Sequence, residues 1–328
     1  MYTVRKIVVT IAAIALTAAM LAACGAKAND NVSTGNAATT ESSSSPSPVE
    51  AATRSVVDSK GHTVEIPTHP AKVVYTGSDL GDVLALGIKP IGADLEVIAD
   101  QVAYSDLLAG IEDIGEASAN LEKILALEPD LILMDSGGTY YDTKDYEALN
   151  KVGPTVTYDR LKTFERLLTI GELLGKRQEA EKWINDFKVK AEDVKKQLDV
   201  KEGETAAVFI RLGKQFYVMG DSGFANILYD TLGYVPTPRI QKELIDKNER
   251  FTDISSEVLP EYSGDYLFIL TDDDEAARSE ATSFTQEKVF QSIEAVANKR
   301  VYYIETKWNF DDPVTKDRLL DELPKILK

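Results

Sequence analysis

Two kinds of apolar pattern alternate along the chain from residue 72 onward. Short runs rich in β-branched residues are typical of buried strands, and apolar positions that recur every three or four residues are typical of helices. In the first half, strands are expected at residues 72–76, 90–93, 130–134 and 155–158. Helices are expected at residues 78–87, at 121–127 and between 142 and 153. Ser78 is expected to cap the first helix. This alternation indicates a parallel sheet with helices on both faces.

The longest helical pattern covers residues 176–198 and contains neither Gly nor Pro. Its apolar residues fall on one helical face, and the other face is charged. The apolar residues are Ala180, Trp183, Ile184, Phe187, Ala191, Val194 and Leu198. At about 1.5 Å per residue the helix would span roughly 35 Å. It could pack on a single domain or join two lobes as a strut, and the flanking halves, each near the usual domain size, favour the strut.

The strand and helix pattern resumes after this central helix. Strands are expected at residues 205–210, 215–220, 265–270 and 300–305. One helix is expected to end at Gly233 and another to begin at Pro313 and close the chain. The fold class is therefore α/β, with two lobes of mostly parallel sheets bridged by one long helix. We expect an N-terminal lobe at 56–159, linking helices at 160–199 and a C-terminal lobe at 200–328.

A β-hairpin is predicted at residues 56–67, where two alternating runs flank Lys60 and Gly61. The two histidines of the chain, His62 and His69, lie in or just after this hairpin. A metal site would need further imidazole or thiol ligands, and the sequence places none nearby. We therefore expect both histidines to be surface residues and expect no direct metal site.

The first 23 residues have the order of a secretory signal, because Arg5 and Lys6 precede a long apolar run. A single membrane-spanning helix is the alternative. The run ends in LAACG, residues 21–25, which resembles the bacterial lipobox. This resemblance implies cleavage before Cys24 and attachment of lipid to its thiol, which would anchor the mature protein to the membrane.

Residues 24–55 are expected to form the lipidated end and a flexible tether. The segment is rich in Asn, Ser, Thr and Ala and includes SSSSPSP, so it has few large side chains to bury. Such a composition cannot offset the entropy that ordering would cost. Since Cys24 is the only cysteine, the exported chain would contain no disulfide.

Charge and missing motifs exclude several functions. The formal net charge of −18 makes nucleic acid an unsuitable partner. The sequence contains no HExxH, GxSxG or CxxC motif, and no GxGxxG follows a predicted strand. An extracellular α/β enzyme is therefore the less favoured alternative, and no cofactor is expected.

Several segments together resemble the class III periplasmic binding proteins, in particular the siderophore-binding lipoproteins of Gram-positive iron ABC transporters. They are DSKGHTVEIPTHPAKVV, DVLALGIKPIGA, IGEASANLEKILALEPDLIL, IGELLGKRQEAEKW, FTDISSEVLPEYSGDYLFIL and NKRVYYIETKWNFDDP, and they touch most of residues 56–328. The resemblance implies two Rossmann-like lobes bridged by one helix. It also implies capture of a ferric siderophore between the lobes and delivery to a permease and its ATPase at the extracellular face of the cell membrane.

The resemblance leaves the ligand class open among hydroxamate, catecholate and citrate complexes. Heme and cobalamin carriers share the fold and remain alternatives. In every siderophore case, the iron would be held through the chelator and not by protein ligands. Ferric complexes rich in oxygen are held by charge-assisted hydrogen bonds and aromatic walls.

Arg211 is the leading ligand-binding candidate, because it follows an apolar strand at the expected crevice and an unpaired buried guanidinium is costly. Tyr217 matches a ligand-contacting tyrosine of hydroxamate-binding relatives. Trp308, which follows the last strand, could fill the core or cover a ligand. The weaker rim candidates are Arg239, Tyr140 and Tyr141. Some hydroxamate binders carry Trp and Arg just after the Gly-Asp turn, and this chain has Gly223 and Ala225 near there, which disfavours a ferrichrome-like ligand.

Two glutamates are expected to dock the permease. Relatives carry one glutamate on the outer surface of each lobe, which pairs with arginines of the transporter. By their place in the motifs these are Glu122 and Glu257. Without the resemblance, a single glutamate is most simply a solvated surface residue.

Overall fold

The computed structural model describes most of the chain between residues 52 and 327. The described residues are 52–96, 98, 101–115, 120–137, 142–212, 215–272, 279, 282–283 and 286–327. The predicted signal, Cys24 and nearly all of the predicted tether lie outside this set, as do Tyr140 and Tyr141. Among the described residues, no helix combines the length and the apolar character needed to cross a bilayer.

The N-terminal lobe is built on a five-stranded sheet in which every pairing is parallel, in the order β5-β4-β3-β6-β7. Its strands are β3 (Val73–Thr76), β4 (Gly92–Ala93), β5 (Glu112–Asp113), β6 (Leu131–Asp135) and β7 (Thr155–Tyr158). The four predicted strands are confirmed, and β5, only two residues long, was not predicted. The predicted hairpin is also confirmed, as the antiparallel pair β1 (Thr53–Val57) and β2 (Thr63–Pro67).

The helices of this lobe follow the predicted pattern, with one correction. They are α1 (Gly81–Ala85), α2 (Leu121–Leu127), α3 (Thr143–Leu149) and α4 (Thr163–Leu173), with a short 3₁₀ turn η1 (Ser105–Leu107). The expectation that Ser78 caps α1 was wrong, because α1 begins at Gly81 and no side chain caps it in that way. The backbone N–H of Gly81 instead donates to the hydroxyl of buried Tyr104, 3.1 Å away. A tertiary contact thus replaces the local cap.

The C-terminal lobe is built on a mixed sheet with the order β11-β9-β8-β12-β13, and β10 pairs with the beginning of β8. Its strands are β8 (Thr205–Leu212), β9 (Gln215–Met219), β10 (Val235–Pro236), β11 (Phe251–Ile254), β12 (Tyr266–Thr271) and β13 (Val301–Glu305). Strands β8, β12 and β13 run parallel, whereas β9 is antiparallel to both β8 and β11. The four predicted strands are confirmed. Strands β10 and β11 were not predicted because both are short and mostly solvent-exposed or half-buried.

The helices of the C-terminal lobe include a π-helical turn. They are α6 (Phe224–Asn226), its continuation η3 (Ile227–Leu232), α7 (Pro238–Glu243), α8 (Leu259–Tyr262), α10 (Glu294–Ala297) and α11 (Pro313–Ile326). Short 3₁₀ turns are η4 (Ile245–Lys247), η5 (Ser256–Val258), η6 (Phe290–Ser292) and η7 (Thr306–Trp308). Gly233, with φ of 85°, ends η3 as predicted. Pro313 begins α11 as predicted, and Asp312 caps that helix by accepting a hydrogen bond from the Thr315 N–H at 2.9 Å.

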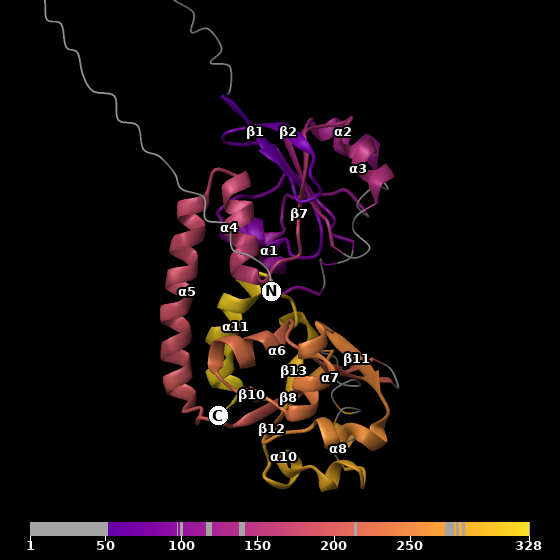
Figure 1. Cartoon of the computed structure of the whole chain (residues 1–328), viewed down its shortest axis with the longest axis vertical. Coiled ribbons are helices and arrows are strands. Elements are labelled where there is room, and N and C mark those ends of the chain that lie inside the picture. Colours follow the sequence, from indigo (N-terminus) through magenta and orange to yellow (C-terminus); the bar gives the residue numbers. More distant parts are fainter. Residues whose placement is uncertain are drawn as a thin grey trace, which may run out of the picture. The chain divides into compact units, whose positions relative to one another are not determined.

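The long helix α5 (Arg177–Leu198) packs against both lobes, as Figure 1 shows. Its first half contributes Ala180 and Ile184 to the N-terminal core. Its second half contributes Phe187, Ala191 and Val194 to the C-terminal core. Trp183 and Phe164 contact both cores, with their rings 6.4 Å apart. The interpretation of this helix as a strut between two lobes is therefore confirmed.

A buried arginine joins elements of the two lobes. Arg166 of α4 is 2% exposed, and its Nε donates to Asp82 of α1 at 2.6 Å. The same guanidinium lies 3.7 Å from Asp79 and donates to the backbone carbonyl of Asp311, just before α11, at 3.0 Å. These contacts, which we call the ionic junction, tie α1 and α4 to the start of the last helix.

Candidate ligand-binding site

A cavity of about 390 Å³ opens on the C-terminal lobe beside the hairpin β8–β9 and the adjoining strand β11. It is lined by Ile210, Tyr217, Met219, Ser222, Arg250, Phe251 and Asn309. Two of these side chains are aliphatic or thioether, two are aromatic, one is a guanidinium, and the last two are a hydroxyl and an amide. We call this cavity the C-lobe pocket. A mostly apolar cavity with a few polar groups is the usual construction of a small-molecule site.

The pleat of the sheet explains why these residues gather. Within the sheet, Tyr217 of β9 pairs with Ile210 of the neighbouring strand β8, and Met219 of β9 pairs with Phe251 of the other neighbouring strand, β11. Directly paired residues of antiparallel strands share a face, and residues two apart on one strand share it as well. All four side chains therefore lie on the same face of the sheet. The structure places Tyr217, a residue selected from the sequence, in the pocket.

Arg211 lies on the opposite face of the hairpin from Tyr217. Its cross-strand partner is Phe216, and the guanidinium carbon lies 6.0 Å from the centre of that ring. Phe216 belongs to the core on the far side of the sheet. The sequence argument selected Arg211 because it lies at the carboxyl end of β8, and selected Tyr217 because it matches a ligand-contacting tyrosine of the family that the chain resembles. The register separates them, because neighbouring positions on a strand point to opposite faces.

Arg239 does not reach the C-lobe pocket. It lies on α7, which follows β10 at the amino end of β8 and so starts away from the carboxyl edge of the sheet. Its guanidinium pairs with Glu243 at 3.1 Å and with Glu261, and it stacks over the ring of Tyr262 at 4.4 Å. These contacts indicate a structural surface cluster rather than a ligand contact.

Trp308 is not among the residues that line the C-lobe pocket. It lies in η7, directly after β13, and packs half-buried against the C-terminal core. Its neighbour Asn309 does line the pocket. Of the two roles considered for Trp308, its contacts support packing on the core. Because the next residue, Asn309, lines the pocket, the fluorescence of Trp308 should still respond to ligand binding.

The sequence analysis missed Phe251, which begins strand β11, and Arg250, which directly precedes that strand. The Arg250 side chain is 54% exposed and Phe251 is 53% exposed. Phe251 packs edge-on against Tyr217, with ring centres 5.9 Å apart and an interplanar angle of 77°. The signal available in the sequence was an aromatic residue beside an arginine within a polar stretch. Without the assignment of β11, this signal could not be connected with Tyr217 or with a pocket.

Asp311, which lies near Arg250 of the pocket, already has its negative charge matched by Lys316. Asp311 accepts from Lys316 Nζ at 3.0 Å and from the Gly223 N–H at 3.0 Å. Burial acts to raise the pKa of Asp311, but the Lys316 charge and the Gly223 bond dominate together and hold the pKa at about 2. Asp311 therefore remains a carboxylate at neutral pH with its charge matched by Lys316.

The carboxyl edge of the N-terminal sheet is polar and closed by its own hydrogen bonds. Arg160 donates to the buried Asp135 carboxylate at 2.9 and 3.1 Å, and the Tyr158 hydroxyl donates to that of Tyr75 at 2.7 Å. Burial raises the pKa of Asp135, although Arg160 opposes the shift. The carboxyl edge of the N-terminal sheet is thus polar, with its side chains hydrogen-bonded to one another, whereas the C-terminal sheet carries the mostly apolar C-lobe pocket.

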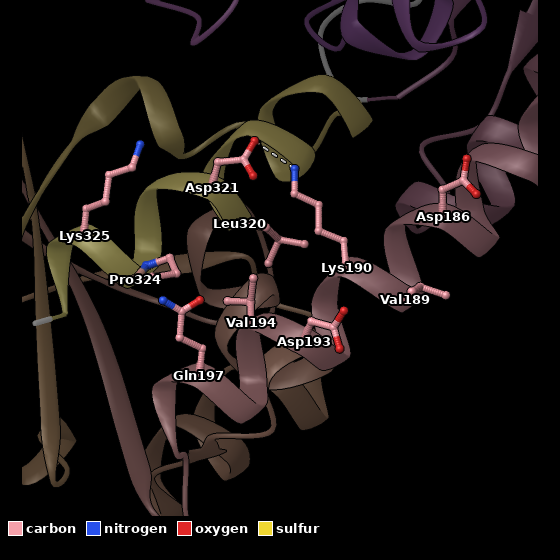
Figure 2. A pocket seen from close by; sticks show the side chains of 10 residues that line it. All are labelled: Asp186, Val189, Lys190, Asp193, Val194, Gln197, Leu320, Asp321, Pro324 and Lys325. Carbon is pink, nitrogen blue, oxygen red and sulfur yellow. Dashed lines mark ion pairs between the residues drawn. The ribbon is translucent and has the colours of Figure 1, made fainter.

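A larger groove, of about 630 Å³, lies between α5 and α11 (Figure 2). Its lining residues are Asp186, Val189, Lys190, Asp193, Val194, Gln197, Leu320, Asp321, Pro324 and Lys325. Lys190 crosses it to pair with Asp321 at 2.9 Å. The groove contains no aromatic side chain and lies on helices rather than at a strand edge, so its size alone does not make it the better candidate.

Neither histidine points to a metal site. The His62 ring stacks on Tyr146 at 3.9 Å, and its Nδ1 lies 2.9 Å from the Asp58 carboxylate. Within the described part of the chain, no three His, Cys, Asp or Glu side chains are grouped closely enough to hold a metal ion.

The two predicted docking glutamates are both exposed. Glu122 lies in the first turn of α2 and Glu257 lies in η5, on different lobes. Neither forms an ion pair with any residue that the structure describes. Both carboxylates are therefore accessible to a partner.

Comparison with known proteins shows a family. Residues 73–307 match the family model described as periplasmic binding protein. The iron(3+)-hydroxamate-binding protein FhuD of Bacillus subtilis is 30% identical over 321 residues, 94% of each chain. The Fe(3+)-citrate-binding protein YfmC of the same organism is 25% identical, covering 76% of this chain and 77% of the relative. The structure of Staphylococcus aureus SirA complexed with staphyloferrin B superposes with a TM-score of 0.69 at 25% identity, covering 84% of this chain and 98% of SirA.

Proposed function

Because this chain belongs to the periplasmic binding protein family, we propose that it captures a ferric siderophore and delivers it to an ABC transporter. The family consists of substrate-binding proteins and not of enzymes. The observation that carries the proposal is the C-lobe pocket, where Tyr217 and Phe251 form an aromatic wall beside one guanidinium. Such a surface suits an oxygen-rich ferric complex with an apolar periphery.

The names of the relatives support this ligand class without selecting one chelator. One binds an iron hydroxamate, one binds ferric citrate, and one was solved with staphyloferrin B. The first two names specify iron in complex with an organic ligand. We propose the same here, with the iron held by the chelator between the two lobes and the protein contacting the organic ligand.

The proposal includes a lipid anchor at Cys24 on the extracellular face of the membrane. The support is the lipobox-like segment at residues 21–25 together with the polar tether that follows it. Cys24→Ala should abolish lipid labelling and release the chain from the membrane or leave it unprocessed. Normal processing and membrane retention of this variant would contradict the anchor.

The proposal also includes docking to the permease and its ATPase partner through Glu122 and Glu257. Their exposure on separate lobes is the structural support. Reversing both charges to Lys should abolish uptake of the ferric complex and leave its binding by the isolated protein unchanged. Normal uptake by the double variant would show that docking relies on other residues.

The central experiment titrates the purified, detergent-solubilised full chain with ferric citrate, ferric staphyloferrin B and ferrioxamine B. The readout is the fluorescence of its two tryptophans, Trp183 and Trp308. We expect saturable quenching by at least one complex and recovery of that complex chemically unchanged. If none of these complexes binds, the ferric siderophore proposal fails.

Heme is the second candidate, because Met219 contributes to the pocket lining and a thioether can serve as an axial iron ligand. The same titration should therefore include hemin, with the visible spectrum as readout. A heme spectrum that changes in Met219→Leu would favour this alternative over siderophore capture.

A further inference from the structure

Residues 223 and 225 leave no room for the large side chains, Trp and Arg, that the resemblance expects nearby in some hydroxamate binders. Gly223 has φ of 57° and ψ of −130°, and a Cβ at this position would lie 2.3 Å from Asn309 Oδ1. A side chain at residue 223 would therefore collide with Asn309 and strain the backbone. Ala225 is fully buried in the C-terminal core. An aromatic wall and a cation for the ligand must come from other positions.

Strand β11 places an aromatic residue, Phe251, in the lining of the C-lobe pocket. Phe251 pairs with Met219 in the sheet and packs edge-on against Tyr217. It is nevertheless 53% exposed, although a phenylalanine contributes to stability mainly when it is covered. An exposed aromatic ring on the rim of a cavity, supported by a second ring, is suited to covering an apolar part of a ligand.

Arg250 is held by its backbone while its head group stays accessible. Its carbonyl accepts from the Gly220 N–H at 2.8 Å and from the Ser222 hydroxyl at 3.1 Å. The nearest carboxylate oxygen in an ion pair is Asp311 Oδ2, at 3.9 Å from the guanidinium. Since Lys316 already matches the charge of Asp311 at 3.0 Å, the contact to Arg250 is the weaker one.

We propose that Arg250 and Phe251 form the ligand clamp of this chain. The Arg250 guanidinium donates hydrogen bonds to oxygen atoms of the ferric complex, and Phe251 together with Tyr217 covers an apolar part of the same ligand. This inference rests on the proposed function. It assigns the ligand contacts to the beginning of β11 and withdraws the leading role from Arg211, which lies on the other face of the hairpin.

The test compares Arg250→Ala with Arg211→Ala, using whichever of ferric citrate, ferric staphyloferrin B and ferrioxamine B the wild-type chain binds. Arg250→Ala should weaken binding at least tenfold and Arg211→Ala less than threefold, while both keep the thermal midpoint of the unliganded protein. Arg250→Lys should lose affinity because it keeps the charge without the planar fork of donors. Phe251→Leu should also weaken binding, since it removes the ring and keeps an apolar side chain.

Three results would overturn the clamp. The first is wild-type affinity in Arg250→Ala, and the second is a loss in Arg211→Ala that exceeds the loss in Arg250→Ala. The third is a lowered thermal midpoint in both Arg250→Ala and Arg250→Lys without any change in affinity, which would make Arg250 a structural partner of Asp311. Failure of the wild-type chain to bind any of the three complexes would refute the proposed function itself, and the clamp with it.

Discussion

Arg166 and Arg250 have the same guanidinium group in opposite environments, one buried and paired and the other exposed to solvent. Arg166 is almost fully buried and is matched by Asp82, Asp79 and backbone carbonyls of the chain. Arg250 is more than half exposed, and its ion pair within the described part of the chain is a distant one with Asp311, whose charge Lys316 already matches. The difference teaches that burial and pairing, rather than residue type, separate an arginine that holds the fold from one available to a ligand.

The largest effect is expected at the ionic junction. Arg166→Leu leaves the buried carboxylates of Asp82 and Asp79 without their cation, which typically costs about 3–5 kcal/mol of unfolding free energy. Denaturant unfolding at neutral pH measures the loss. The matched control is the double variant Arg166→Leu with Asp82→Leu, which removes both charges and should recover part of the stability. If Arg166→Leu and Arg250→Ala destabilise the protein equally, the contrast between the two arginines is wrong.

A pH effect of intermediate size is expected next to the junction. Burial raises the pKa of Asp312 to about 6 from the ordinary 3.8, although hydrogen bonds from Thr315 oppose the shift. The folded protein therefore binds this proton more tightly than the unfolded chain, so the stabilisation is complete below pH 4 and is lost as the pH rises through about 6. A shift of this size corresponds to about 3 kcal/mol.

Asp312→Asn tests this pH dependence, because Asn also caps helices and does not titrate. Unfolding free energies at pH 4, 5, 6 and 7 should show a smaller decline with rising pH in the variant than in the wild type. Identical pH profiles for the two proteins would show that the Asp312 carboxyl does not titrate in this range. The affinity of the C-lobe pocket for its ligand should be unaffected by this substitution at pH 7.

A smaller effect separates the two faces of the hairpin. Tyr217→Ala should weaken binding of the ferric complex about tenfold, or about 1.4 kcal/mol, because it removes one wall of the pocket. Phe216→Leu, on the opposite face, should reduce stability and leave affinity within threefold of the wild type. Fluorescence titration and thermal unfolding of both variants measure the two quantities. Equal loss of affinity in both would mean that the ligand site spans the edge of the sheet.

The smallest effect is expected at Arg239. Its ion pairs with Glu243 and Glu261 are largely exposed to solvent, and such pairs contribute roughly 0–1 kcal/mol. Arg239→Ala should therefore change unfolding free energy by less than about 1 kcal/mol and should leave ligand affinity unchanged. A clear loss of affinity in this variant would place the site near α7.

The architecture could be predicted from the sequence because its signals are long and repeated. The apolar face of α5 extends from Ala180 to Leu198, about five turns, and strands such as β6 and β12 are nearly continuous apolar runs. Predictions from neighbouring residues failed where a contact with a residue distant in sequence stabilises the end of an element. Tyr104 replaces Ser78 at the start of α1 in this way.

The candidate site was less predictable, for a geometric reason. Whether Arg211 or Ile210 faces the pocket depends on a register that alternates with every residue, and one position exchanges the two faces. Strand β11 has four residues with mixed exposure, so Phe251 and its neighbour Arg250 could not be assigned to a sheet. Their role depends on a pairing with β9 that brings together segments distant in sequence.

The ionic junction has a consequence for the order of assembly. Arg166 belongs to the first half of the chain, but its guanidinium also bonds the carbonyl of Asp311, which immediately precedes the final helix α11. Arg318 of α11 likewise pairs with Asp106 in the N-terminal lobe. For a chain translated from its N-terminus, the N-terminal lobe therefore lacks these contacts until the final segment has been made. A protein truncated before residue 311 should therefore leave Arg166 and Asp106 without these partners and be more easily degraded by proteases.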